Sequence, residues 1–151
     1  TGPDTIPLTL EWTDAYERRR VPKAETAAES ASYEVEAPKP RPVQMLALEE
    51  LRRLRDDGER RALVIAATGL GKTYLAAFDS RGFDRVLFVA HREELLNQAA
   101  DAFAKVRPRD DFGFVVGGRR EMDRRLVFAS VQSLGAVLAE DPDALAGFDY
   151  A

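Results

Sequence analysis

The chain has 151 residues, of which 45% are apolar and 32% charged, enough for one ordinary domain with a core or for one domain with an extension. It contains no cysteine and a single histidine, His91, which excludes a disulfide framework and a metal site rich in Cys or His. The 22 basic and 26 acidic residues give a net charge of −4, so any contact with nucleic acid has to come from local patches. Thr1 in the place of an initiator methionine indicates a piece of a longer protein. Without an apolar run of about 20 residues or a leader peptide, we predict a cytoplasmic protein with no membrane partner.

Residues 1–40 differ in composition from the rest and are predicted to be an N-terminal extension with a proline-rich linker. Alternation of apolar and polar residues over 6–12 predicts a half-buried strand, and residues 15–20 and 24–31 each predict a short helix. Prolines at 38, 40 and 42 remove backbone donors and push the preceding residues toward extended geometry. We therefore expect residues 37–42 to form a stiff connector that is not helical.

From residue 41 onward the pattern alternates between helices and strands. A stripe of apolar residues from Val43 to Leu54 predicts a helix that ends at Gly58. Further helices are predicted over 73–80, 95–106 and 131–138, and buried strands over 63–67, 85–90, 112–116 and 126–129. This order is typical of an α/β fold, in which helices cover both faces of a parallel sheet. We expect the strands at 63–67, 85–90 and 126–129 to run parallel.

The segment Ala-Ala-Thr-Gly-Leu-Gly-Lys-Thr at 66–73 follows a predicted strand and precedes a predicted helix, as a phosphate-binding loop requires. Glycines let successive backbone N–H groups turn toward phosphate oxygens, and the start of the helix adds its positive dipole end. Lys72 is predicted to reach the β and γ phosphates, and the Thr73 hydroxyl to bind Mg²⁺. The predicted nucleotide-binding residues of the loop are Ala67, Thr68, Gly69, Leu70, Gly71, Lys72 and Thr73, with Lys72 and Thr73 as the catalytic residues and Thr73 as the metal ligand.

The loop resembles the first ATPase motif of superfamily 2 helicases and translocases, which tolerates alanine where this chain has Ala66. Upstream, Arg41-Pro42-Val43-Gln44 is similar to the Arg-Pro-aromatic-Gln stretch of that superfamily. The resemblance implies that Arg41 and Gln44 lie at the nucleotide and that Gln44 reads the adenine edge, to which an amide offers one donor and one acceptor. Val43 departs from the usual aromatic residue.

Three downstream segments resemble nucleic-acid-contacting motifs of the same superfamily. Residues 89–99 are similar to the motif after the second strand, especially in relatives of type III restriction enzyme subunits. The double glycine before the basic window 119–125 matches a loop in which backbone approaches nucleic acid, and residues 128–134 resemble the following motif. The residues that these resemblances assign to the nucleic-acid backbone are His91, Arg92, Gly117, Gly118, Arg119, Ser130 and Ser133.

Each of these segments also has an ordinary structural interpretation. His91 can bond its own backbone at a helix start, the basic window can be a charged hairpin, and the serines can cap a helix. The motifs follow one another in the superfamily's order over residues 41–134, however, which is far more specific than any one of them.

Taken together, the motifs identify residues 41–151 as the N-terminal portion of the first RecA-like motor domain of a superfamily 2 DEAD/DEAH-box helicase, close to Res subunit relatives. This implies a P-loop NTPase fold that stops before the Walker B strand. It also implies a parent that is an ATP-dependent DNA helicase or translocase using ATP and Mg²⁺, with RNA not excluded. Its further partners would be the Walker B segment and the second RecA-like lobe of its own motor.

The chain alone is expected to be inactive, because the Walker B acids and the arginine finger of the second lobe lie outside it. A nucleotide-gated binding or scaffold module without hydrolysis remains an alternative. A P-loop kinase or AAA+ ATPase would share the loop but would not explain Gln44, Arg92 and the segment 130–133 together.

Overall fold

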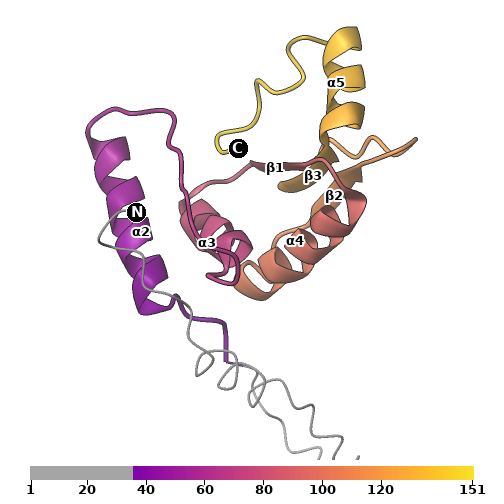
Figure 1. Cartoon of the computed structure of the whole chain (residues 1–151). Helices are drawn as coiled ribbons and strands as arrows, with labels where there is room; N and C mark the ends of the chain where they lie inside the picture. Colours follow the sequence, from indigo (N-terminus) through magenta and orange to yellow (C-terminus); the bar gives the residue numbers. More distant parts are fainter. Residues whose placement is uncertain (1–35) are drawn as a thin grey trace, which may run out of the picture. The chain divides into compact units, whose positions relative to one another are not determined.

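A computed structural model describes residues 36–151, and all of its elements belong to a unit that spans residues 37–151 (Figure 1). The strand and the two helices expected over 6–31 lie outside the described residues. The elements in chain order are α2 (Pro42–Asp56), α3 (Lys72–Asp79), η1 (Ser80–Gly82), β1 (Val86–Ala90), α4 (Glu93–Val106), β2 (Phe112–Val115), β3 (Leu126–Ser130) and α5 (Val131–Glu140). No helix within residues 36–151 is long and apolar enough to cross a bilayer.

The sheet has three parallel strands in the order β1-β3-β2. Leu126 at the start of β3 pairs with Val86 on one side and with Phe112 on the other, so the three strands start level. They also end close to level, at Ala90, Val115 and Ser130. The α/β fold and the strands at 85–90, 112–116 and 126–129 are therefore confirmed.

Side chains alternate between two core layers, one on each face of the sheet. Leu126 and Phe128 of β3 pack with α3 and α4, and Phe103 of α4 stacks edge-on against Phe128 at 5.5 Å between ring centroids. Val127 and Ala129 point to the other face and pack with Leu134 and Val137 of α5. Helices thus cover both faces, with α3 and α4 on one side and α5 on the other (Figure 1).

Helix α2 begins one residue earlier than the proline pattern predicts. Pro42 is its first residue, which corrects the expectation that all of 37–42 is non-helical. A proline is tolerated at this position because the first N–H of a helix has no partner inside the helix. The predicted end of the helix at Gly58, which has a φ of 88°, is confirmed. The Gly58 N–H donates to the Arg55 carbonyl, and the Glu59 N–H donates to the Leu54 carbonyl, each at 2.9 Å. This is the Schellman arrangement.

The strand predicted over residues 63–67 is wrong. These residues form no regular element, and the side chains of Leu63 and Ile65 are 84% and 88% exposed. A strand needs a hydrogen-bonding neighbour, and residues 63–67 pair with none of the three strands; at the edge of β1 that faces away from β3, Tyr150 pairs with Val86. The Leu87 N–H donates to the Tyr150 carbonyl at 2.8 Å. The parallel arrangement therefore holds for β1 and β3 but does not include 63–67.

The outer edge of β2 is covered by the chain that returns toward β3. The Phe114 N–H donates to a carboxylate oxygen of Glu121 at 2.8 Å, and the Glu121 N–H donates to the Phe114 carbonyl at 3.1 Å. The crossing is so close that a Cβ on Gly113 would lie 2.6 Å from the Glu121 Cβ and 2.7 Å from its carbonyl oxygen. Only glycine fits this position of the strand without moving backbone.

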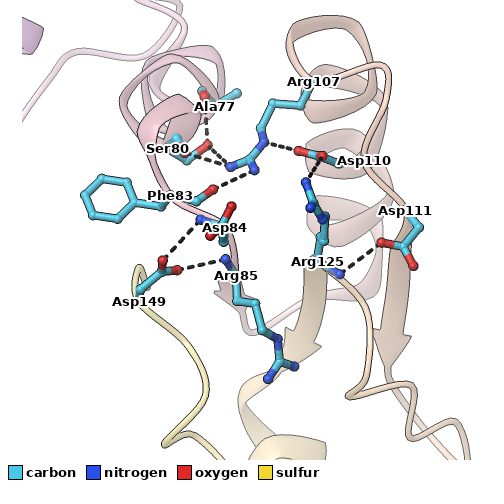
Figure 2. A network of polar contacts seen from close by, with 10 residues as sticks. All are labelled: Ala77, Ser80, Phe83, Asp84, Arg85, Arg107, Asp110, Asp111, Arg125 and Asp149. Carbon is cyan, nitrogen blue, oxygen red and sulfur yellow. Dashed lines mark hydrogen bonds and ion pairs between the residues drawn. The ribbon is translucent and has the colours of Figure 1, made fainter.

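A polar network joins the amino-terminal ends of the strands (Figure 2). Its centre is Arg107, 8% exposed, which donates to the carbonyls of Ser80 and Phe83 at 2.7 Å each and to the Asp110 carboxylate at 2.5 Å. Asp110 also accepts from Arg125 at 3.2 Å. One side chain thus connects the turn after α3 to the segments that lead into β2 and β3.

At the same edge, the Asp149 carboxylate accepts from the N–H groups of Asp84 and Arg85 at 3.1 and 2.8 Å (Figure 2). The neighbouring Tyr150 hydroxyl donates to Asp79 at 2.8 Å. Burial, and after it the hydrogen bond to Asp79, raises the pKa of Tyr150, so its hydroxyl stays protonated and keeps this bond.

The Arg107 network predicts a large and local stability effect. Arg107→Gln should lower the free energy of unfolding by about 3 kcal/mol, because a buried carbonyl, a partly buried carbonyl and a largely buried carboxylate lose their donor. The measurement is urea denaturation. Arg109→Gln, an exposed arginine of the same turn, is the control and should stay within about 0.5 kcal/mol of wild type. Equal effects of the two variants would contradict the structural role of Arg107.

Candidate functional site

The loop at 66–73 has the backbone geometry of a phosphate cradle. Gly69 and Gly71 have φ values of 88° and 75°, which residues with a Cβ rarely adopt, and the Leu70 N–H donates to the Ala67 carbonyl at 3.3 Å. Gly71 is the N-cap residue of α3, so the loop opens directly onto the start of that helix. A Cβ placed on Gly69 would have no other atom within 4 Å, so there is open space beside the loop. These features fit a bound phosphate group.

Lys72 and Thr73 are the first two residues of α3. The Lys72 side chain is exposed, and its Nζ donates to the Ala66 carbonyl at 3.1 Å, so it already lies across the loop. The Thr73 side chain is partly buried. An exposed amine held by one hydrogen bond can exchange a carbonyl oxygen for a phosphate oxygen at little cost.

Gln44 joins α2 to the phosphate loop. Its side chain is buried, 5% exposed, and its Nε2 donates to the carbonyls of Leu70 and Gly71, each at 3.1 Å. Its Oε1 accepts from the Arg41 N–H at 2.9 Å, which fixes the start of α2. For Gln44 to contact adenine as predicted, its amide therefore has to give up its hydrogen bonds to the loop carbonyls and form new ones to the base. The sequence alone did not indicate its contact with the loop.

A second site forms where the strands end. A pocket of about 480 Å³ is lined by His91 after β1, Gly117 after β2, and Ser130 and Ser133 at the start of α5. Four of the predicted nucleic-acid residues thus lie around one cavity, at the edge where open α/β sheets bind their ligands. Glu93, Val116, Arg120, Gln132 and Ala136 complete its wall.

Both serines line the pocket, and Ser130 is also the N-cap residue of α5. The Ser130 hydroxyl accepts from the Ser133 N–H at 3.1 Å, and the Ser133 hydroxyl accepts from the Gly117 N–H at 3.1 Å. Gly117 has a φ of 59°, which the turn after β2 requires. Each hydroxyl keeps its own hydrogen as a donor for a ligand oxygen. Capping and phosphate contact are therefore compatible here.

Arg92 is the N-cap residue of α4 and is exposed, and within residues 36–151 its side chain has no hydrogen bond or ion pair. Gly118 is exposed and does not line the pocket. Arg119 turns away from the pocket, bonds Glu121 at 2.9 Å and covers the Phe114 ring at 5.1 Å. The hydrogen bond from the Phe114 N–H, and then the one from Arg119, hold the pKa of Glu121 below its usual range.

The other arginines of the basic window are paired as well. Arg120 binds Glu140, Arg124 binds Asp111 at 3.5 Å, and Arg125 binds Asp110 at 3.2 Å. The window is therefore not an open patch of positive charge. Arg120 belongs to the basic window 119–125 predicted from the sequence but was not among the assigned contact residues, and it is the one of these arginines that lines the pocket. The sequence showed that Arg120 lies in a basic loop, but not that its side chain borders the pocket.

A parallel α/β sheet with a glycine-rich phosphate loop ahead of α3 defines the class: a P-loop NTPase of the RecA-like kind. Residues 37–150 match the family model of the type III restriction enzyme, res subunit. The chain belongs to this family. A search of curated proteins gave no match. Membership makes it part of an ATP-dependent motor domain of the helicase type, a class that generally works with ATP, Mg²⁺ and nucleic acid.

The contact between Gln44 and the loop predicts different costs for two glycine substitutions. Gly69→Ala places a Cβ in open space and should cost about 1 kcal/mol of unfolding free energy through backbone strain alone. Gly71→Ala adds a Cβ 2.6 Å from the Gln44 Nε2 and should cost about 2–3 kcal/mol. Urea denaturation measures both. In a Gln44→Ala background the cost of Gly71→Ala should fall by about 1 kcal/mol, and an unchanged cost would contradict the coupling.

Proposed function

We propose that this chain binds ATP with Mg²⁺ through residues 66–73 and holds a nucleic-acid backbone in the pocket at the carboxyl ends of the strands. The observation that carries the proposal is the convergence of His91, Gly117, Ser130 and Ser133 on one pocket. These residues come from three separate motifs, and the parallel register brings them to one edge of the sheet.

For the nucleotide, we assign the phosphates to the loop N–H groups and Lys72, the metal to Thr73, and the adenine to Gln44. The positive φ values of Gly69 and Gly71 and the exposed Lys72 amine support the phosphate assignment. A Mg²⁺ ion held by Thr73 would supply positive charge next to the phosphates. Lys72 and Thr73 bind and orient but do not activate water, so we expect no ATP turnover stimulated by nucleic acid from the 151-residue chain by itself.

For the nucleic acid, DNA is the proposed partner. Arg92 supplies a cation without a partner among the described residues, and the N–H groups at the start of α4 and α5 supply donors. None of these groups reads a base edge, so the contact they offer is to the sugar–phosphate backbone and independent of sequence.

Lys72→Ala should weaken the binding of Mg-ATP by more than tenfold in isothermal calorimetry, because a charge-assisted contact to the phosphates is lost. Lys105→Ala, an exposed lysine in the last turn of α4, removes the same charge away from the loop and should leave binding unchanged. If Lys72→Ala binds Mg-ATP as tightly as wild type does, the loop is not the nucleotide site.

Arg92→Gln should reduce the salt dependence of DNA binding. Each phosphate contact to a single strand contributes about 0.7 to the slope of log K against log salt concentration, so the loss of one contact lowers the slope by that amount. The measurement is fluorescence anisotropy of a labelled oligonucleotide at several NaCl concentrations. Arg109→Gln, an arginine at the opposite edge of the sheet, should keep the wild-type slope. An unchanged slope in Arg92→Gln would remove Arg92 from the interface.

A further inference from the structure

Arg120 stands on the wall of the pocket but is held by an acid from another element. One guanidinium nitrogen donates to Glu140 Oε1 at 3.1 Å and the other to Oε2, so the ion pair is bidentate. The two residues are 20 positions apart and connect the loop after β2 to the last residue of α5. Arg120 shares the pocket wall with His91, Ser130 and Ser133, to which the proposed function gives a phosphate-binding role.

The stability of the fold does not account for this ion pair. The side chains of Arg120 and Glu140 are 48% and 65% exposed, and such pairs contribute little to folding because both partners stay hydrated when apart. Glu140 also lies at the C-terminal end of α5, where the negative end of the helix dipole disfavours an acid. The hydrogen bond and the charge of Arg120 hold the pKa of Glu140 below its usual range, so the carboxylate is ionised at neutral pH.

The other arginines of the window differ from Arg120. The Glu121 carboxylate that binds Arg119 also closes the edge of β2 at Phe114, so it has a structural role. Arg124 and Arg125 bind Asp111 and Asp110, which precede β2 at the far edge of the sheet. Arg120 alone among them borders the pocket and can leave its acid without exposing a buried group.

A carboxylate and a phosphodiester offer a guanidinium the same pair of anionic oxygens. Building on the proposed function, we propose that Arg120 is a phosphate ligand for a single nucleic-acid strand and that Glu140 is an internal competitor for it. The charge of residue 140 then sets how tightly the pocket holds the strand. With Glu140 in place, Arg120 is available only when the strand displaces the carboxylate.

The test uses the 151-residue chain and a fluorescein-labelled, single-stranded oligothymidylate of 20 nucleotides, followed by anisotropy at several NaCl concentrations. Glu140→Gln should tighten binding by about two- to fivefold, the range that an exposed ion pair represents, and should steepen the salt slope by up to about 0.7. In the double variant Arg120→Gln/Glu140→Gln this gain should disappear, because the released guanidinium is absent.

The matched control is Glu50→Gln, which removes one carboxylate from an exposed ion pair with Arg53 on α2 and gives the same net charge. It should bind as wild type does. An equal gain in Glu50→Gln, or a gain that persists in the double variant, would overturn the inference in favour of general charge.

The test also separates this inference from the proposed function. If wild type binds and Arg92→Gln flattens the slope while Glu140→Gln changes nothing, only the competition is overturned. If no variant binds the oligothymidylate at the lowest salt concentration, the proposed nucleic-acid function is contradicted and the inference with it. Far-UV circular dichroism of each variant checks that its helices are retained.

Discussion

The hydrogen bonding of β3 on both of its edges is the constraint on which the rest of the structure depends. Residues 126–129 are at most 1% exposed, because they are paired with β1 and β2 at the edges and covered by helices on both faces. Parallel strands that start level also end at the same side of the sheet. The turns that follow the three strands therefore meet there, although they are far apart in sequence.

Stability and binding are separated along the strands. The amino-terminal ends carry the polar network around Arg107, whose side chain is buried and donates to the carbonyls of Ser80 and Phe83 and to Asp110. The carboxyl ends carry groups with unused hydrogen-bonding capacity, such as the exposed Arg92 side chain and the half-buried hydroxyls of Ser130 and Ser133. This division follows from the fold class, since helices that follow the strands begin at that edge and direct their free N–H groups toward it.

The sequence predicted the features that depend on local patterns. The period of apolar residues located α4 and α5, and the chemistry of glycine located the end of α2 at Gly58 and the phosphate loop. The strand predicted at 63–67 was wrong because an apolar run indicates only that a segment could be buried on both faces of a sheet. It does not show which strand would pair with that segment. In the structure residues 63–67 pair with no strand, and Tyr150 is bridged to Val86 on that edge of β1.

Contacts between distant residues could not be read in this way. The Gln44 amide meets carbonyls 26 and 27 residues away, and Arg120 meets an acid 20 residues away. The residues around Gln44 and Arg120 in the sequence do not indicate which distant groups these side chains bind. An arginine-rich window predicts positive charge, but the tertiary structure decides how much of that charge is left for a ligand.

Because Glu121 crosses over the outer edge of β2, a further strand can be added to the sheet only at its other edge, beside β1. An unprotected edge strand is a template for another strand, from the same chain or from a second molecule. At Phe114 the carboxylate and the N–H of Glu121 already occupy the groups that such a strand would use, and the missing side chain of Gly113 lets this cover lie flat. A strand that joins this sheet would therefore do so beside β1, where Tyr150 is the one residue paired among residues 36–151.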